Sequence, residues 1–246
     1  IKKKAKIVNI NLKIIDAEDY FLKALSCITD AEKKRQTFKK IYKEIFDGAI
    51  KDFDAKYIAQ GSLATDFIES GAVGNAALIK SHHNVGLGFS CEELHPFRNL
   101  FKYEVREIAK AMALPDFISL CNPFPGPGLF LRVLGAPPSK ENLDILRWAD
   151  NEVAGIIAKH NLEKEFSQLI VALHCAPTVG VKGDGRVYKN NVIVRAVFTF
   201  DFMTAKGYQF PPEVRQEITS HITKHPEIVR VWFDETNKPP ATTEFE

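Results

Sequence analysis

The chain has 246 residues, of which 45% are hydrophobic and 26% charged, so it can bury one large core or two smaller ones and is not a disordered protein. Lysine and arginine total 33 against 31 aspartates and glutamates, and a net charge of +2 excludes the broad basic surface of a DNA-binding protein. No apolar run is long enough to span a membrane, and the basic first residues lack a signal peptide's apolar segment, so we expect a cytoplasmic protein without nucleic-acid or membrane partners.

Strands and helices alternate at the start of the chain. Residues 6–16 are rich in β-branched side chains and predict a strand, and the acidic cluster DAED that begins at its end predicts the start of a helix. Residues 31–48 carry apolar side chains at helical spacing, with Gly48 as the expected end. A short strand at 55–61 precedes Ser62, a residue suited to cap a helix.

The alternation continues with a short predicted strand at 76–83 and an amphipathic helix at 101–114. Strands that alternate with helices favour parallel pairing and an α/β layered fold. The segment NPFPGPG, residues 122–128, has three prolines and two glycines, which exclude a helix and a regular strand ladder. We therefore expect a domain boundary there, with domains at 1–122 and 123–246.

The second predicted domain has an α+β pattern in which helices and strands are mixed. Its expected elements are a helix at 139–161, strands at 166–174 and 191–201, a helix at 212–224 and a strand at 227–234. The segment 179–190 has three glycines without the spacing of a phosphate loop, and its GDG sequence is typical of a hairpin turn.

Two carboxylates follow the predicted strand at 55–61. Asp66 and Glu69 are three residues apart on the expected helix, so their side chains share a face near its start. Acids at this position complement the helix dipole. They could equally support Mg²⁺ or position a nucleotide beside a strand end, and the spacing leaves both interpretations open.

A cationic segment follows at residues 80–88. His82 and His83 are adjacent, so neither a strand nor a helix lets both bind one metal easily, and the four cysteines of the chain show no zinc-type spacing. Lys80 with these histidines supplies several donors ahead of two glycines. The pattern fits a lid that closes over charge developing on phosphate, or a solvated polar loop.

Seven stretches, in order, resemble the synthetase part of the glutamine-hydrolysing GMP synthase family. They are AQGSLATDFIES, IKSHHNVG, PFRNLFKYEVREIA, NPFPGPGLFLRVLG, VGVKGDGRVY, VRAVFTFDFMTA and KPPATTEFE. The resemblance spans residues 10–246. It implies a partial adenine-nucleotide α hydrolase-like parallel sheet with flanking helices, which is the C-terminal portion of an ATP pyrophosphatase domain, followed by a smaller α+β dimerisation domain.

The resemblance also implies a carbon–nitrogen ligase. ATP with Mg²⁺ adenylylates the O2 atom of XMP with loss of pyrophosphate, and ammonia then attacks C2 and expels AMP to give GMP. The implied partners are XMP, ammonia from a glutamine amidotransferase domain or subunit, and a second copy of the chain that binds through the C-terminal domain.

Residue roles follow from the matching motifs. Five residues are implied in adenylylation, namely Asp66, Glu69, Lys80, His82 and His83, and Asp66 is also the implied metal ligand. Five more are implied as substrate contacts, namely Gly61, Arg195, Lys238, Thr243 and Glu244. Lys238 suits the phosphate of XMP, and its two following prolines would stiffen a terminal segment that otherwise frays.

The sequence departs from the family pattern in several places. It has no counterpart of the family's SGG-x-DS phosphate loop or of an amidotransferase domain, so the chain as written is expected to bind ATP poorly. Asn122, His95 and Tyr103 replace residues usual in the family. The alternatives are a truncated or degenerate paralogue that dimerises and binds XMP without turnover, and a related ATP pyrophosphatase such as an NAD synthetase or a tRNA-modifying enzyme.

Overall fold

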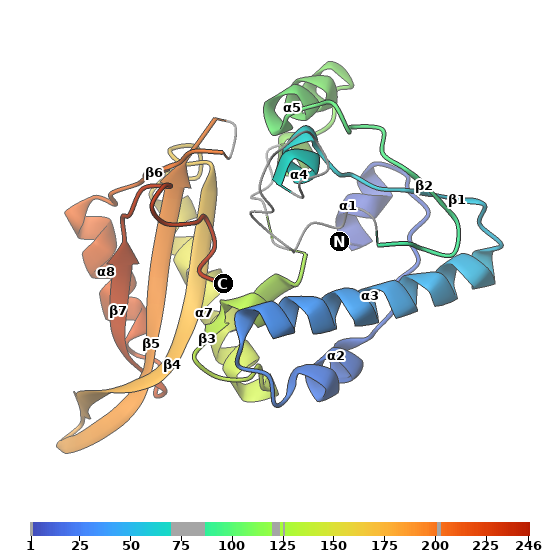
Figure 1. The fold of residues 1–246 in the computed structure, drawn as a ribbon. Coiled ribbons are helices and arrows are strands. Elements are labelled where there is room, and N and C mark those ends of the chain that lie inside the picture. The colour runs from blue at the N-terminus through green and yellow to red at the C-terminus, as the bar shows by residue number, and fades with distance from the viewer. Residues whose placement is uncertain (1, 70–86, 120–123, 125, 201–202) are drawn as a thin grey trace. The chain divides into compact units, whose positions relative to one another are not determined.

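The computed structural model describes residues 2–69, 87–119, 124, 126–200 and 203–246 (Figure 1). Contacts divide the chain into two compact units, the first formed by Ile1–Lys23 with Ile41–Pro123 and the second by Ala24–Lys40 with Phe124–Glu246. The expected mixture of helices with parallel strand pairing is confirmed. The functional division of the chain at residues 122 and 123 stays a prediction.

The first unit is built on a parallel pair of short strands, β1 and β2, in which Tyr57 lies opposite Glu92. The elements that belong to it wholly or in part are α1 (Lys2–Ile7), α2 (Glu18–Leu25), α3 (Ala31–Phe53), β1 (Tyr57–Ala59), α4 (Ala64–Glu69), β2 (Glu92–Leu94), α5 (Lys102–Ala111) and α6 (Asp116–Ser119). The strand expected at 55–61 and the helix expected at 101–114 are confirmed, whereas β2 was not predicted.

The strand predicted at residues 6–16 is wrong. Residues 2–7 form α1, and residues 8–17 form neither helix nor strand. A strand requires a neighbour for its backbone groups, and Ile10 and Ile14 are 62% and 54% exposed instead of packing against one. The helix start expected at DAED is confirmed, because α2 begins at Glu18 within that cluster. The backbone N–H of Glu18 donates to Asp16 Oδ1 at 3.3 Å.

Helix α3 is longer than predicted. Gly48 was expected to end it, yet the helix continues to Phe53 and closes at Asp54, which has a left-handed φ of 49°. A glycine inside a helix costs about 1 kcal/mol, which one further buried side chain can offset. Ile50 supplies that burial, since it is only 8% exposed.

The second unit contains a five-stranded mixed sheet, with helices α7 and α8 packed against each other and against its strands (Figure 1). Strands β4 and β5 are antiparallel, and β3 and β7 add to them in parallel. From η1 onward its elements are η1 (Gly128–Arg132), β3 (Val133–Leu134), α7 (Lys140–Lys159), β4 (Gln168–Lys182), β5 (Gly185–Phe198), β6 (Lys206–Gly207), α8 (Pro212–Ile222) and β7 (Ile228–Asp234).

The elements predicted for this half of the chain are confirmed, including the hairpin turn at GDG. Lys182 lies opposite Gly185, and Gly183 has the positive φ of 58° that a two-residue hairpin turn requires. Val153 and Ile218, from the two helices, are fully buried. Among the residues that the structure describes, no helix combines the length and apolarity needed to cross a bilayer.

Candidate functional site

The first candidate region is the turn between β1 and α4. Gly61 is exposed, and a Cβ atom at this position would meet nothing within 4 Å. Asp66, half-buried in the first turn of α4, accepts a hydrogen bond at Oδ2 from the backbone N–H of Leu63 at 2.7 Å. Asp66 therefore caps the start of α4, and its place near the helix start agrees with the predicted complement to the helix dipole. The cap was predicted at Ser62 instead, but α4 begins at Ala64 and not directly after Ser62.

The remaining residues predicted for adenylylation are not placed by the structure. The backbone of Glu69 ends α4, but its side chain lies outside the described residues. Lys80, His82 and His83 also lie outside them, as does the strand predicted at 76–83. Among the described residues, no group of three or more histidine, cysteine, aspartate or glutamate side chains could hold a metal ion. The lid and the metal role of Asp66 stay predictions.

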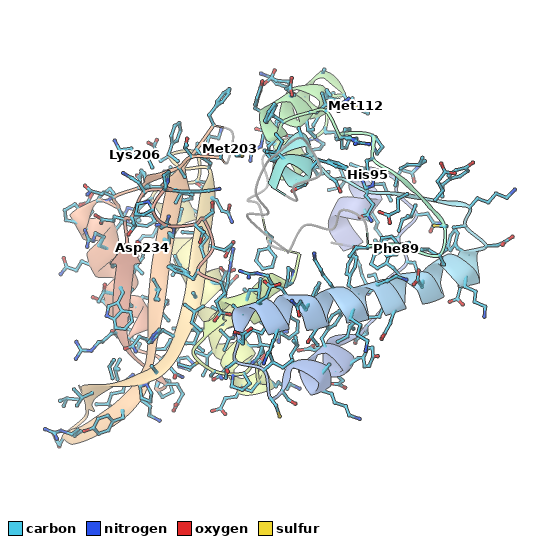
Figure 2. All side chains as sticks on the ribbon, viewed as in Figure 1. Phe89, His95, Met112, Met203, Lys206 and Asp234 are labelled. Atoms are coloured by element: carbon cyan, nitrogen blue, oxygen red, sulfur yellow. The ribbon has the colours of Figure 1, made fainter. Side chains whose placement is uncertain are left out.

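Glu93 on β2 organises the polar groups beside this turn. Its Oε1 accepts hydrogen bonds from the backbone N–H groups of Gly88 and Phe89, at 3.1 and 3.4 Å, and Gln60 Nε2 donates to its Oε2 at 3.4 Å. His95 Nε2 lies 3.6 Å from the same Oε2 atom. Figure 2 labels His95 and Phe89 in this part of the first unit. The carboxyl ends of β1 and β2, where parallel sheets hold ligands, thus carry an ordered polar cluster.

The second candidate region is the tail, defined here as residues 237–246. Its backbone pairs with the loop before β6, because Ala205 and Lys238 exchange N–H···O hydrogen bonds of 3.0 and 2.7 Å. The Lys238 side chain is half-exposed, whereas Thr243 is buried. The tail therefore does not fray as an unanchored terminal segment would.

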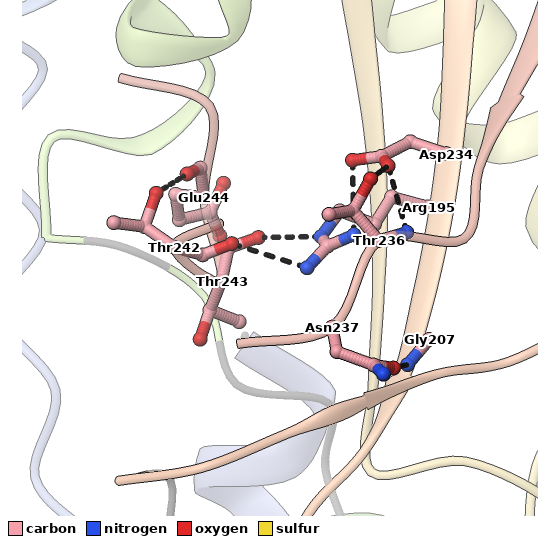
Figure 3. A network of polar contacts seen from close by, with 8 residues as sticks. All are labelled: Arg195, Gly207, Asp234, Thr236, Asn237, Thr242, Thr243 and Glu244. Carbon is pink, nitrogen blue, oxygen red and sulfur yellow. Dashed lines mark hydrogen bonds and ion pairs between the residues drawn. The ribbon is translucent and has the colours of Figure 1, made fainter. Parts of the chain in front are cut away.

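Arg195 on β5 joins the tail to β7. Its guanidinium donates from Nη1 to Asp234 Oδ2 at 2.9 Å, and from Nε and Nη2 to the backbone oxygens of Thr243 and Thr242, both at 3.2 Å (Figure 3). Arg195 is 1% exposed. The structure thus brings together Arg195 and Thr243, which were both predicted to contact the substrate. The hydrogen bonds of the Arg195 guanidinium go to protein groups.

Glu244 is held in a similar way by Arg132, which the sequence did not single out. Arg132 donates from Nε and Nη2 to the two carboxylate oxygens at 3.0 and 2.8 Å, and Gln168 Nε2 donates to Oε1 at 2.9 Å. The aromatic ring of Phe124 lies 4.8 Å from the guanidinium carbon. Burial raises the pKa of nearby Asp150, an effect that Arg132 opposes and Glu244 reinforces.

Lys34 on α3 completes the contacts to the tail. Its Nζ donates to the backbone oxygen of Val133 at 2.6 Å and to Glu246 Oε2 at 2.8 Å, and the lysine is 0% exposed. Burial raises the pKa of the Glu246 carboxyl, and the hydrogen bond from Lys34 opposes this shift. Burial also raises the pKa of the Cys175 thiol to about 11. Lys34 and Arg132 lie far from the tail in sequence, so no local pattern could have indicated them.

Known proteins resemble this chain over most of its length. Residues 155–245 match the family described as the GMP synthase C terminal domain. The chain is 43% identical over 244 residues to the glutamine-hydrolyzing GMP synthase of Thermus thermophilus, covering 97% of this chain and 48% of that protein. It is also 43% identical to a subunit of the glutamine-hydrolyzing GMP synthase of Methanocaldococcus jannaschii, over 243 residues, covering 97% of this chain and 76% of that one. The corresponding subunit of Pyrococcus furiosus gives 43% over 241 residues, with 96% and 74% coverage.

The fold and the two regions define a mixed α/β protein with a polar strand-end turn in one unit and a tail held by buried cations in the other. The comparisons are more specific, and they confirm the resemblance found in the sequence. The chain belongs to the GMP synthase family. It spans about half of the Thermus relative, at 48%, and about three quarters of the Methanocaldococcus subunit, at 76%.

Proposed function

We propose that the chain is the synthetase part of a GMP synthase, a ligase that aminates XMP to GMP with ATP through an adenylyl-XMP intermediate and releases AMP and pyrophosphate. The observation that carries the proposal is the 43% identity to the Methanocaldococcus subunit over 97% of the chain. The alternative of a related ATP pyrophosphatase lacks such support, because the relatives quoted above are GMP synthases.

Within this proposal, residues 1–122 are the C-terminal portion of an ATP pyrophosphatase domain with an adenine-nucleotide α hydrolase-like sheet. The parallel pairing of β1 and β2, with α4 directly after β1, supports this assignment. Ligands of such sheets bind at the carboxyl ends of the strands. Gly61 lies at that edge in open space, so its backbone can approach a substrate closely.

Adenylyl transfer concentrates negative charge on the α-phosphate and on the departing pyrophosphate. We assign Lys80, His82 and His83 as the cationic lid that balances this charge, and Asp66 and Glu69 as the acidic pair that supports the metal. Mg²⁺ prefers oxygen ligands and is usually bound by one or two carboxylates together with substrate phosphates. The carboxylate of Asp66 therefore fits the role of a Mg²⁺ ligand. A bound Mg²⁺ would neutralise phosphate charge.

The XMP site is assigned to the tail and its surroundings. Lys238, with its half-exposed side chain, supplies the cation for the XMP phosphate. The side chains of Arg195 and Glu244 each make three hydrogen bonds to protein groups. We therefore assign to them, together with Thr243, the wall of the XMP site and not the charge that balances the phosphate.

The reaction partners follow from the same proposal. Ammonia would come from a glutamine amidotransferase domain or subunit, because the Methanocaldococcus and Pyrococcus relatives are named as one subunit of a glutamine-hydrolyzing enzyme. A second copy of the chain would bind through residues 123–246. Val179, Val181 and Tyr188 support this dimer, because they are 41%, 76% and 61% exposed on one face of the β4–β5 hairpin.

Turnover and XMP binding test the proposal together. A polypeptide that joins this chain to the family's upstream phosphate loop is supplied with XMP, ATP, Mg²⁺ and ammonium, because the chain as written is expected to bind ATP poorly. The formation of GMP, AMP and pyrophosphate is measured beside calorimetric titration with XMP. Formation of GMP and AMP only when XMP is present supports the proposal. XMP binding without AMP would support the paralogue that binds without turnover, and turnover with deamido-NAD in place of XMP would favour an NAD synthetase.

A variant pair sharpens the assignment of Lys238. Lys238→Ala should weaken XMP binding, because the phosphate loses its cation. Lys224→Ala, at an exposed lysine just after α8, is the matched control and should bind XMP as the unmodified chain does. Unchanged XMP affinity in Lys238→Ala would remove this residue from the site.

A further inference from the structure

The buried cations of the second unit converge on one short segment. Within the described residues, the buried lysine and arginine side chains are Lys34, Arg132 and Arg195, each at most 1% exposed. All three bond to Thr242–Glu246. They come from α3, η1 and β5, so separate parts of the unit hold the same five residues.

Lys34 and Arg132 are linked through adjacent residues of the chain. Arg132 and Val133 are neighbours in sequence, and the Val133 backbone oxygen accepts the hydrogen bond from Lys34. Arg132 donates two parallel hydrogen bonds to the Glu244 carboxylate, and Lys34 donates one to Glu246, two residues further along the chain. A bidentate arginine pair fixes the orientation of a carboxylate as well as its position.

A buried charge is costly unless it is paired and hydrogen-bonded, and a buried ion pair contributes little net stability compared with apolar side chains of similar size. Such pairs can instead specify one geometry. Here the geometry that they specify is the path of the tail, which is also held upstream by the backbone hydrogen bonds between Ala205 and Lys238. Residues 239–243 therefore run between two fixed points.

We propose that Arg132 and Lys34 are positioning residues for the XMP site, acting through Glu244 and Glu246 to hold the tail in the conformation that receives XMP. The inference rests on the proposed function. It extends that function to two residues that contact the tail and not the substrate. Arg195 also holds this segment, through the backbone oxygens of Thr242 and Thr243.

Calorimetric titration of the full chain with XMP tests the proposal, using the substitutions Arg132→Met, Arg132→Lys and Lys34→Met. Tryptophan fluorescence and circular dichroism confirm beforehand that each variant is folded. The two methionine variants should bind XMP about 10- to 100-fold more weakly, because a displacement of about 1 Å in a positioned group has effects of that size. Arg132→Lys keeps the charge but loses the fork, so its affinity should lie between those of Arg132→Met and the unmodified chain.

Hydrogen exchange supplies a second readout that does not depend on XMP. Peptides covering residues 237–246 should exchange faster in both methionine variants, while peptides from β4 keep their protection. Arg147→Met is the matched control, because Arg147 is a half-exposed arginine on α7 paired with Asp144. It should change neither XMP affinity nor exchange of the tail.

The outcomes separate this inference from the function on which it rests. If the unmodified chain does not bind XMP, the proposed function fails and the positioning role fails with it. If it binds XMP and the folded Arg132 and Lys34 variants bind equally well, only the inference is overturned, and these residues merely stabilise the fold. If a methionine variant does not fold, Arg132→Lys and Lys34→Arg decide the question by the same two measurements.

Discussion

The two compact units differ in how completely they bury their side chains. The second unit has a five-stranded sheet, a continuous apolar core and three fully buried cations with bonded partners. In the first unit the buried hydrophobic side chains, among those that the structure describes, are Ile41, Ile50, Phe67 and Phe89. The strands described in this unit, β1 and β2, are each three residues long.

This difference bears directly on the two candidate regions. The tail lies on a sheet whose strands are fixed by neighbours, so polar groups placed on it are positioned before any ligand arrives. The turn that carries Gly61 leads into α4, a helix of six residues that includes Asp66 and has little stability of its own. We therefore expect a preformed XMP site in the second unit and a nucleotide region that is ordered further by its ligands.

The largest expected effect is that of Arg195→Met. It removes the guanidinium from Asp234 Oδ2 and from two backbone oxygens of the tail, while Thr236 still donates to Asp234 Oδ1. Removing one partner of a buried ion pair costs about 3–5 kcal/mol. Urea unfolding followed by tryptophan fluorescence measures this loss in the second unit alone, because both tryptophans, Trp148 and Trp232, belong to it. A loss as small as that of Arg147→Met would show that the tail network is not part of the folded core.

Core truncations compare the two units directly. Ile218→Ala, at a fully buried site on α8, should cost about 2–5 kcal/mol in the same unfolding experiment. Ile50→Ala, in the first unit, should leave the tryptophan transition unchanged and increase hydrogen exchange only within residues 41–123. A shift of the tryptophan transition in Ile50→Ala would mean that the units unfold together.

Local patterns predicted the long elements well. The apolar spacing of α3, α7 and α8 and the β-rich runs of β4, β5 and β7 each depend on neighbours in sequence, and the structure has all of them. The predicted strand at 6–16 failed because β-rich composition does not supply a pairing partner. The helix end predicted at Gly48 was wrong because burial of Ile50 stabilises the helix beyond the glycine.

The candidate site was predictable only in part. The resemblance pointed to Arg195, Thr243 and Glu244, and the structure brings these residues into one network around the tail. It did not point to Arg132 or Lys34, whose partners lie 112 and 212 residues away in sequence. Contacts over such separations leave no periodicity or spacing that a single sequence reveals.

Helix caps extend the comparison at a smaller scale. Ser139 Oγ accepts a hydrogen bond from the backbone N–H of Asn142 at 3.1 Å, so Ser139→Ala should cost the second unit about 1 kcal/mol. Asp66→Ala should increase exchange in α4, whereas Asp66→Asn keeps an oxygen that can accept the hydrogen bond from Leu63. If Asp66→Asn retains the helix but abolishes AMP formation, the charge of Asp66 serves the reaction and not the cap.

The smallest expected effect is a difference in pH dependence between the units. Hydrogen bonds from the Lys43 side chain and the Ser90 backbone lower the pKa of Asp47, so its stabilising contribution to the first unit is present above the unfolded pKa of about 3.9 and is lost as the pH falls through its folded pKa. Burial raises the pKa of Glu246 despite Lys34, so its contribution to the second unit is fully present below about pH 4.3 and is lost as the pH rises through its folded pKa.

Protonation of Glu246 on mild acidification from neutral pH should therefore stabilise the second unit slightly before loss of the Asp47 contribution weakens the first, while His225, whose pKa burial lowers, acts in the opposite direction within the second unit. The tryptophan transition, measured in urea across this pH range, should move further toward higher denaturant in the unmodified chain than in Glu246→Gln, because the amide cannot titrate and both chains keep His225. Asp150, whose pKa burial also raises, contributes in the same direction, so Asp150→Asn should reduce the movement as well. If the transition of Glu246→Gln instead moves further toward higher denaturant than that of the unmodified chain, Glu246 stabilises the second unit as a carboxylate, and its pairing with Lys34 outweighs its burial.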